Sequence, residues 1–202
     1  MIEFLAMLDR IRPLSDPLRE HLSGIMTERR IKRNEFLVKA GVINSHVFFI
    51  KEGIVRCYYL KEIGSYRPSR EVSLCFFMEN DIIASTWSFA AQKPGREYMV
   101  ALEDCSIGMI HLAELEKTYA LFPELNLHGR VLTQKYSTRW YNLLGGLRTQ
   151  TAKERYDFLL SNSPVLHQRI PAKYLASYLG INAVTLSRIK RATPSYKPPR
   201  PS

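Results

Sequence analysis

The side chains with the clearest binding chemistry lie near the C-terminal end of the chain, between residues 183 and 191. Hydroxyl and cationic groups recur there, at Thr185, Ser187, Arg188, Lys190 and Arg191. A guanidinium group binds phosphate or the edge of guanine through two parallel hydrogen bonds, and a lysine ammonium attracts phosphate as a point charge. This set of side chains therefore predicts contact with a polyanion, and nucleic acid is the polyanion that suits it best.

Two short helical patterns place these groups on one surface. In residues 169–179 the apolar side chains follow the spacing of a buried helix face, Gly180 permits a tight turn, and Asn182 suits the N-cap of a second helix. Leu186 and Ile189 of that second helix point inward together. Its outward face carries Ala183, Val184, Ser187, Arg188 and Arg191. The pattern predicts a helix-turn-helix that enters a DNA major groove. The alternative is an ordinary helical hairpin with a solvated basic face.

The chain carries 29 lysines and arginines against 19 aspartates and glutamates, a net charge of +10, and most of this excess lies after residue 145. The segment after residue 145 contains ten basic residues but only two acidic ones, Glu154 and Asp157, which gives it a net charge of +8. The ten bases are Arg148, Lys153, Arg155, Arg169, Lys173, Arg188, Lys190, Arg191, Lys197 and Arg200. Such a basic segment attracts double-stranded DNA better than it fits a membrane. For Lys197 and Arg200, a solvated tail is the alternative.

Length and composition bound the organisation. A chain of 202 residues with 46% hydrophobic content can bury one sizeable core and a smaller second one, so two domains are expected. Cys57, Cys75 and Cys105 are too far apart for a zinc or iron–sulfur site, and buried free thiols predict a reducing, cytoplasmic location. Charges interrupt the apolar N-terminus, and no apolar run approaches the roughly 20 residues of a membrane helix. We therefore expect no membrane partner.

Residues 1–30 have helical spacing, broken at Pro13 and Pro17, and strand patterns follow. Six short segments rich in β-branched and aromatic residues, separated by turn formers, cover residues 35–41, 46–50, 54–60, 71–77, 98–102 and 106–110. Many short strands at this spacing are typical of a sandwich, jelly roll or barrel. The expected fold class is therefore α+β, with a double-stranded β-helix or jelly-roll barrel first and helices after it.

A long helix is predicted from Phe122-Pro123-Glu124, where proline and an acid suit a helix start, to Gly145-Gly146, which should end it and supply a hinge. A heptad-like seam runs along it, at Leu125, Gly129, Leu132, Tyr136, Arg139 and Leu143. Such a seam favours a dimer interface with the same helix of a second copy. The alternative is packing on the chain's own barrel, because only about two and a half heptads exist and Gly129 and Arg139 interrupt the apolar pattern.

The capping-box spacing of Thr151 and Glu154 predicts the start of the next helix, which should stop at Asn162-Ser163-Pro164. The proline-rich segment after residue 192 is expected to be a disordered tail with no room for a full β-hairpin wing. Four parts are therefore predicted. They are a barrel with N-terminal helices (1–121), a dimerisation helix with a hinge (122–146), a helix-turn-helix domain (147–192) and a disordered tail (193–202).

Several short motifs accompany this order of barrel, long helix, capped helix and helix-turn-helix. They are Val47-Phe-Phe-Ile-Lys-Glu-Gly53, Asn80-Asp81-Ile82-Ile83, Ala101-Leu-Glu-Asp104, Lys153-Glu-Arg155, Tyr174-Leu-Ala-Ser-Tyr-Leu-Gly-Ile181 and Thr185-Leu-Ser-Arg188. Over nearly the whole chain, the order and the motifs resemble the Crp/Fnr family of bacterial transcription regulators, and their texture is closest to members from Bacteroidetes-type bacteria. The resemblance implies a cyclic-nucleotide-binding-like barrel followed by a winged-helix-like DNA-binding domain.

Members of that family that bind cyclic nucleotides hold ribose and phosphate with a Gly-Glu pair and an Arg-Ser or Arg-Thr pair. This chain has Ala84 and Ser85 in place of the first pair and Gly95 and Arg96 in place of the second. Arg96 could still reach an anion if the 92–96 loop differs in length. A buried phosphodiester without a guanidinium partner is poorly stabilised, so we expect no cofactor and no binding of cyclic AMP.

An altered pocket for an unknown small-molecule effector is an alternative use of the same region. Its candidate residues are Ala84, Ser85, Trp87, Ser88, Arg96 and Tyr98. Aromatic side chains in a barrel are more often ordinary core than pocket lining, so the core is the preferred interpretation for Trp87 and Tyr98.

The resemblance also assigns roles within the second helix of the helix-turn-helix. Ala183 and Val184 stand where family members carry hydrogen-bonding base readers, which leaves Arg188 as the main candidate for a bidentate contact with guanine. Val184 is a candidate for contact with a thymine methyl group. Thr185 and Ser187 are expected at phosphates or base edges. The cations expected to hold the DNA backbone are Lys173, Lys190 and Arg191.

These observations favour a homodimeric DNA-binding regulator, with double-stranded DNA, a second copy of the chain and RNA polymerase as partners. A small-molecule-sensing barrel with a vestigial DNA-binding module is the alternative, because Ala183 and Val184 carry no base-reading groups and the wing is missing. Neither a catalytic nor a metal site is expected. No nucleophile–base grouping occurs, and the histidines fall in separate segments, at His21, His46, His111, His128 and His167.

Overall fold

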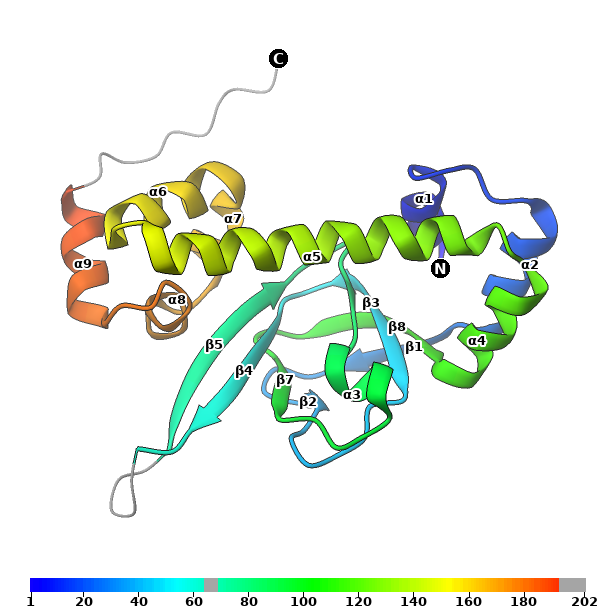
Figure 1. Ribbon diagram of the computed structural model, residues 1–202, viewed down its shortest axis with the longest axis horizontal. Coiled ribbons are helices and arrows are strands. Elements are labelled where there is room, and N and C mark those ends of the chain that lie inside the picture. The colour runs from blue at the N-terminus through cyan, green and yellow to red at the C-terminus, as the bar shows by residue number, and fades with distance from the viewer. Residues whose placement is uncertain (64–68, 193–202) are drawn as a thin grey trace. The chain divides into compact units, whose positions relative to one another are not determined.

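Two four-stranded sheets form a β-sandwich in the N-terminal part of the chain (Figure 1). The computed structural model describes residues 1–63 and 69–192. One sheet has the strand order β1-β8-β3-β6 and the other β2-β7-β4-β5. The strands are β1 (Thr27–Ile31), β2 (Phe36–Val38), β3 (His46–Glu52), β4 (Val55–Lys61), β5 (Arg70–Phe77), β6 (Ile82–Ile83), β7 (Glu97–Ala101) and β8 (Cys105–His111). Strands followed by helices confirm the mixed α and β class.

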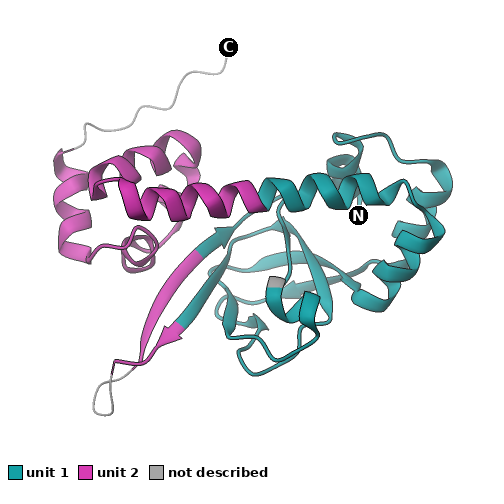
Figure 2. Cartoon of the chain, in the orientation of Figure 1, with its two compact units in different colours: residues 1–59, 75–136 teal, residues 60–74, 137–202 magenta. Residues whose placement is uncertain are grey.

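Along the chain, helices come before, between and after the strands of the sandwich. They are α1 (Ile2–Asp9), α2 (Asp16–Ile25), α3 (Thr86–Ala91), α4 (Leu112–Leu121), α5 (Leu125–Thr149), α6 (Ala152–Asn162), α7 (Pro164–Arg169), α8 (Ala172–Tyr178) and α9 (Ala183–Ala192). The chain divides into two compact units, which we call the barrel unit (residues 1–59 and 75–136) and the C-terminal unit (residues 60–74 and 137–202) (Figure 2). Both α5 and the β4–β5 hairpin pass from one unit into the other.

All six segments with strand-like patterns form strands, but β1 lies in a region where the spacing predicted helix, and that prediction is wrong there. Four of the five residues of β1 are exposed, so no alternation of apolar side chains marks it. It forms because its backbone pairs with β8, from Thr27 opposite Met109 to Ile31 opposite Cys105. Pairing with a distant strand thus overrides the local pattern.

The N-terminal helices are fixed to the sandwich by an apolar core. Ser15 caps α2 by accepting a hydrogen bond from the Leu18 N–H (3.4 Å). Leu18 and Leu22 are 0% and 1% exposed, and the ring of Phe4 in α1 lies 5.3 Å from that of Phe49 in β3. Burying each such side chain contributes about 1.5–3 kcal/mol relative to exposure. The beginning of α5 packs into the same core.

Packing holds the first half of α5 against this core. Leu125 is one of the buried residues of the cluster, and Leu132 packs against it. A Cβ on Gly129 would lie 2.4 Å from the hydroxyl of Tyr119 in α4. A larger residue at position 129 would therefore require the Tyr119 side chain to move.

Tyr136 adds a polar anchor between α5 and the segment before β6. Its hydroxyl donates to Asp81 Oδ1 (3.2 Å) and accepts from the N–H of Ile82 (2.7 Å). Its ring also lies against Phe77 of β5, with centroids 6.4 Å apart. Because Asp81 is only 7% exposed, each hydrogen bond to its carboxylate offsets part of its desolvation cost. The barrel unit thus fixes one face of α5 by both packing and hydrogen bonds.

These contacts involve the predicted dimer seam. Its first four members, from Leu125 to Tyr136, contact the chain's own barrel unit, as the alternative interpretation expects, and a dimer through them stays a prediction. The last two members, Arg139 and Leu143, are half-buried. Apolar periodicity identified a covered face of the helix but not what covers it. The exposed apolar side chains of α5 are instead Trp140 (38% exposed), Tyr141 (78%), Leu144 (57%) and Leu147 (42%).

The long helix does not end at Gly145-Gly146, and the prediction of a helix end there is wrong. α5 continues to Thr149, whose hydroxyl donates to the carbonyl oxygen of Gly145 (2.9 Å). A glycine inside a helix costs about 1 kcal/mol relative to alanine, which the surrounding helix can offset. Gly146 is buried, so a small residue at this position also suits the packing around it.

The C-terminal unit has a small core of its own. The capping box that opens α6 is confirmed: Thr151 Oγ1 accepts from the Glu154 N–H (3.3 Å), and Glu154 Oε2 accepts from the Thr151 N–H (2.7 Å). α6 ends at Asn162 as predicted, and α7 follows at once. The side chains of the core are Tyr156, Leu159, Leu160, Leu166, Ile170, Leu175, Leu179 and Leu186. Local capping and apolar spacing together account for this bundle.

The predicted disordered tail, residues 193–202, lies outside the described residues, and so does any wing after α9. From α6 to α9 the chain forms helices and turns only. Within the described ranges, no helix is both long enough and apolar enough to span a bilayer.

We predict that Gly145→Ala raises the free energy of unfolding by about 0.5–1 kcal/mol, because alanine favours the helix and a Cβ there meets no atom within 4 Å. Gly129→Ala is the matched control and should destabilise, since its Cβ would collide with Tyr119. Urea unfolding followed by circular dichroism measures both. A Gly145→Ala variant less stable than the parent would contradict a continuous helix.

Candidate nucleic-acid interface

The turn between α8 and α9 is built on the backbone of Gly180. Its φ of +68° is a left-handed conformation that glycine adopts without strain. The Gly180 N–H donates to the carbonyl of Ser177 (3.2 Å), and the Ile181 N–H donates to that of Ala176 (3.0 Å). These two bonds are the Schellman motif, which satisfies the last carbonyl groups of α8. A Cβ at Gly180 would also lie 3.1 Å from Leu147 Cδ2, so the turn packs closely on α5.

Arg155 supports this turn from α6. Its Nε donates to the carbonyl of Leu179 (2.9 Å), and its Nη1 donates to that of Gln150 (2.5 Å). Hydrogen bonds from a cation to the free carbonyls at helix ends are stronger than neutral ones. Arg155 belongs to the basic excess of this segment, but its guanidinium is committed to positioning the turn. The net charge alone therefore overstates the cations that can meet a ligand.

Asn182 caps α9 as predicted, because its Oδ1 accepts from the Thr185 N–H (2.8 Å). Leu186 is buried at 1% exposed, and Ile189 is half-buried, which agrees with the expected inward face. The predicted outward residues, all of them exposed, are Ala183, Val184, Ser187, Arg188 and Arg191. Thr185 and Lys190 are half-buried beside this face. The structure thus brings the predicted recognition residues together on one helix surface.

The cations of α9 are not neutralised within the described chain. No carboxylate there lies within ion-pair distance of Arg188, Lys190 or Arg191, whereas Lys153 of α6 pairs with Asp157 at 2.5 Å. Arg191 Nη2 instead lies 3.4 Å from Ser187 Oγ. Exposed charges without counter-charges produce a positive potential that attracts anions.

The other candidate cations have distinct surroundings. Burial lowers the pKa of His167 in α7, and the positive charge of Lys190 lowers it further, so Lys190 lies near α7 rather than fully in solvent. Lys173, on α8, is exposed, and its ammonium lies 4.6 Å from the ring centre of Tyr174. Neither belongs to the exposed α9 face, and their predicted contact with a phosphate backbone stays a prediction.

The β4–β5 hairpin meets α8 inside the C-terminal unit. Ser177 Oγ accepts from the N–H of Ser73 (2.9 Å) and lies 3.3 Å from the carbonyl oxygen of Glu71, to which it donates. Within the described residues β5 is an edge strand of its sheet, so a group other than a neighbouring strand can bond to its backbone there. The hydroxyl of Ser177 thus makes two hydrogen bonds to the backbone of β5. The sequence offered no signal for this contact, because Ser177 reads as an ordinary helix residue.

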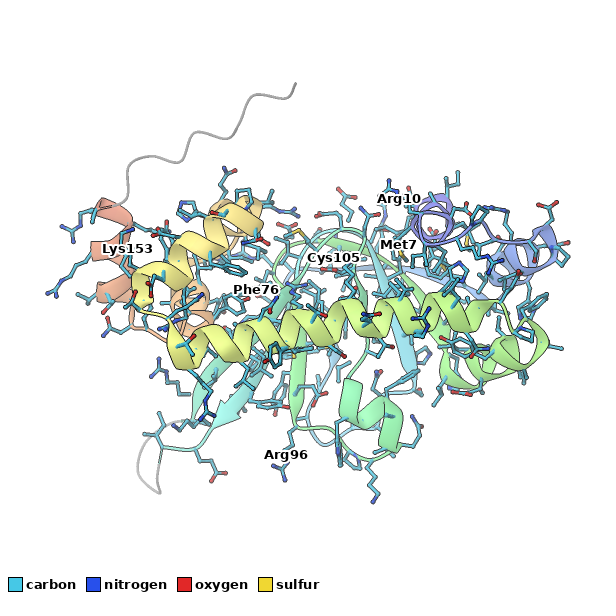
Figure 3. The ribbon with its side chains drawn as sticks, turned by 45° about the horizontal axis from the view of Figure 1, so that its top comes forward. Met7, Arg10, Phe76, Arg96, Cys105 and Lys153 are labelled. Atoms are coloured by element: carbon cyan, nitrogen blue, oxygen red, sulfur yellow. The ribbon has the colours of Figure 1, made fainter. Side chains whose placement is uncertain are left out.

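The candidate pocket residues of the barrel differ in exposure. Ser85 and Ser88 are both fully buried around α3, and Ala84 is half-buried just before it. Trp87, in contrast, is 56% exposed. Arg96 is exposed and points away from the strands (Figure 3).

Tyr98 lies on the other face of β7 from the buried residues of the pocket region. Its ring stacks on that of Tyr58 in β4, its cross-strand neighbour, with centroids 5.1 Å apart. Side chains alternate between the faces of a strand, so Glu97, one residue earlier, points to the opposite face. Glu97 is only 7% exposed and accepts a hydrogen bond from Ser85, although no motif in the sequence pointed to it. Its signal was a single acid at the start of an otherwise uncharged strand.

The histidines and cysteines have local structural roles. His46 and His111 are cross-strand neighbours with ring centres 5.0 Å apart, and His111 Nδ1 accepts from the Ala113 N–H (3.2 Å) to cap α4. Burial lowers the pKa of His46, and the charge of His111 lowers it further. The cysteines are buried and free, and burial raises the pKa of Cys105 to about 11, which disfavours its reactive thiolate. Over residues 1–63 and 69–192, no three metal-ligating side chains gather.

Comparisons with known proteins agree with this architecture. Residues 28–120 match the cyclic nucleotide-binding domain family. The chain is similar to FixK2 from Bradyrhizobium japonicum, with a TM-score of 0.71 and 20% identity over 83% of this chain and 84% of that one. It is also similar to CLP, a c-di-GMP responsive global regulator of Xanthomonas campestris (TM-score 0.67, 16% identity, 88% and 91% covered).

A transcriptional regulator of the Crp/Fnr family from Eubacterium rectale has a TM-score of 0.66 and 16% identity, over 89% of this chain and 83% of that one. No curated protein sequence matches the chain. Residues 28–120 therefore form a domain of the cyclic nucleotide-binding type, and the chain has the fold of Crp/Fnr regulators. The resemblance found in the motifs is confirmed, and the likeness to Bacteroidetes-type members stays a prediction.

We predict that Asn182→Ala lowers the free energy of unfolding by about 1 kcal/mol, because the first turn of α9 loses its capping oxygen. Asn182→Ser is the control, since serine caps nearly as well and should cost much less. Thermal unfolding of the three proteins measures the difference. Equal stabilities for alanine and serine would show that the cap does not hold α9.

Proposed function

We propose that this protein is a sequence-specific DNA-binding transcription regulator of the Crp/Fnr type that acts as a homodimer. The observation that carries the proposal is the α9 surface, where exposed Arg188 and Arg191 have no counter-charge in the described chain. The Schellman turn at Gly180 and the Asn182 cap hold this surface in one conformation. A capped helix with an unpaired cationic face is the element that a major groove accepts.

Each side chain of the α9 surface suits a particular part of DNA. Arg188 is placed to bond a guanine edge through two hydrogen bonds, and Val184, 61% exposed, to touch a thymine methyl group. Ser187 and Thr185 can bond phosphate or base edges. Lys173, Lys190 and Arg191 supply attraction to the backbone without reading sequence. Because Ala183 and Val184 offer no hydrogen bonds to bases, affinity should exceed sequence discrimination.

The exposed stripe of α5 is the proposed dimer surface. Trp140, Tyr141, Leu144 and Leu147 follow the spacing of one helix face and leave large apolar areas in solvent. The first half of the helix is already occupied, because Tyr136 and Leu125 contact the barrel there, so the exposed stripe lies in the second half. Pairing of two α5 helices would cover the stripe and carry two α9 helices, to be placed in successive major grooves about 34 Å apart.

The remaining assignments belong to the same proposal. The chain is not an enzyme, works in the cytoplasm and contacts RNA polymerase when bound to DNA. It does not respond to cyclic AMP, because Gly95 carries no side chain to bind a phosphate and Arg96 points outward.

A small-molecule sensor with a weak DNA-binding module is the second candidate, favoured by the apolar Ala183 and Val184 on the recognition surface. A thermal-shift screen against nucleotides and metabolites separates the two. A ligand at 100 times its dissociation constant stabilises by about 2.7 kcal/mol, whereas a regulator without an effector shows no shift.

We predict that Arg188→Ala reduces the preference for a selected DNA site over random duplex by about 5- to 150-fold, the value of one bidentate base contact. Arg191→Ala should weaken binding to all duplexes alike and reduce the salt slope by about one. Lys153→Ala is the control, because its charge is already paired with Asp157 and its loss should change little. Fluorescence anisotropy at several salt concentrations measures all three. Identical behaviour of the three variants would rule out a role for the α9 surface.

We predict that Leu144→Glu dissociates the dimer, because it places a charge in the centre of the exposed α5 stripe. Phe158→Glu is the matched control, since Phe158 of α6 is also exposed, at 51%, but lies outside the stripe. Sedimentation velocity gives the mass of each variant. A monomeric parent protein, or a Leu144→Glu variant that stays dimeric, would contradict the proposed surface.

A further inference from the structure

Four polar side chains are buried together where α3 meets β7 in the barrel unit. Ser85 and Ser88 are 0% exposed, Asn44 is 6% exposed and Glu97 is 7% exposed. Ser88 accepts from the Asn44 N–H (3.0 Å) and donates to the carbonyl of Lys93 (2.6 Å). Every member of this cluster therefore has a defined hydrogen-bond partner, which is the condition for burying polar groups at low cost.

Glu97 is the only ionisable member, and both of its carboxylate oxygens accept hydrogen bonds. The Ser85 hydroxyl donates to Oε1, and the backbone N–H of Arg96 donates to Oε2 (3.1 Å). In the described chain, no lysine, arginine or histidine lies within ion-pair distance of this carboxylate. A hydroxyl and a main-chain amide converging on two oxygens without a cation are a set of anion-binding donors.

Gly95 makes room for the carboxylate. A Cβ at this position would lie 3.1 Å from Ser85 Oγ and 3.2 Å from Glu97 Oε2, so no larger residue fits unless the cluster shifts. The resemblance places nucleotide-contacting residues of cyclic-nucleotide binders at the positions of Ser85, Gly95 and Arg96. The Glu97 carboxylate therefore sits among the groups that border the expected ligand site.

Glu97 also has a titratable neighbour on the adjacent strand β4. Tyr59 of β4 is the cross-strand partner of Glu97. Burial raises the pKa of the Tyr59 phenol, and the charge of Glu97 raises it further.

We propose that Glu97 is a built-in anionic ligand: its carboxylate occupies the donors with which this barrel would otherwise hold the anionic group of a small molecule. The chain thereby supplies its own occupant, and the barrel is held in one state without an effector. A ligand bearing a phosphate or carboxylate would have to displace Glu97 against its two hydrogen bonds and its negative charge. The inference concerns the barrel unit alone and does not rest on the DNA-binding proposal.

Removal of the internal carboxylate should expose the donors. Glu97→Ala leaves the Ser85 hydroxyl and the Arg96 N–H facing a space of carboxylate size. We expect the midpoint of thermal unfolding of this variant to fall below that of the parent. Sodium acetate should then raise it by about 3 °C relative to sodium chloride at equal ionic strength, because a free anion refills the site. The parent protein should show no acetate-specific shift.

Two variants control for the site. Glu97→Gln fills the same volume without charge and should gain no response to acetate. The double variant Ser85→Ala with Glu97→Ala lacks the hydroxyl donor and should lose most of the response. Should Glu97→Ala not fold, Glu97→Ser opens the same space and carries the same expectation. Inorganic phosphate and cyclic AMP in parallel arms show whether the opened site prefers a larger anion.

Three results would overturn the inference. One is an equal acetate shift in the parent and in Glu97→Ala, and another is no acetate shift in either opened variant. The third is stoichiometric binding of phosphate or cyclic AMP to the parent, which would show that the site is open with Glu97 in place. None of these readouts involves DNA, so their failure is distinguishable from failure of the proposed regulator function.

Discussion

The seating of the first half of α5 on the barrel is the constraint on which the other assignments depend. Leu125 enters the N-terminal core, and the Tyr136 hydroxyl bonds both the buried Asp81 carboxylate and the Ile82 N–H. Side chains that pack on and hydrogen-bond to their own barrel in this way are not available to another molecule. The proposed self-association therefore uses the apolar stripe from Trp140 to Leu147, which the described chain leaves in solvent. The same helix continues without a break into the C-terminal unit, so it is the element through which a twofold contact would reach the DNA-binding surface.

Charge in the C-terminal unit is divided between structure and binding. Arg155 uses its guanidinium on the carbonyl groups that end α5 and α8, and Lys153 pairs with Asp157. Arg188 and Arg191 have no such partner in the described residues. The barrel shows the reverse arrangement, since Glu97 is buried and held by neutral donors only. Among the described residues, the α9 surface thus has exposed cations without counter-charges, and the site beside α3 has a buried anion without one. The difference explains why the first is proposed to bind a partner and the second to fill its own site.

Local signals in the sequence were sufficient wherever local physics decides the structure. Alternation located six strands, and capping chemistry located Asn182 and the Thr151–Glu154 box to the residue. Prediction was wrong where a distant contact decides. β1 has no apolar alternation and exists through its pairing with β8, and Gly145-Gly146 stays helical within a long continuous helix. The α5 seam shows the same limit, since periodicity reveals that a face is covered but not by what. Glu97 could not be identified from the sequence, because its place in a buried site depends on a hydrogen bond from Ser85, twelve residues away.

Selection of bound duplexes from a random DNA pool by the full-length protein tests the central claim most directly, because it requires the α9 surface and the twofold assembly together. We expect enrichment of a pseudo-palindromic motif with half-site centres about 10 base pairs apart, one helical turn of DNA. We also expect that guanine is conserved at the position read by Arg188. Enrichment of a single unrepeated half-site would contradict the dimer, and no enrichment over the starting pool would contradict sequence-specific binding altogether.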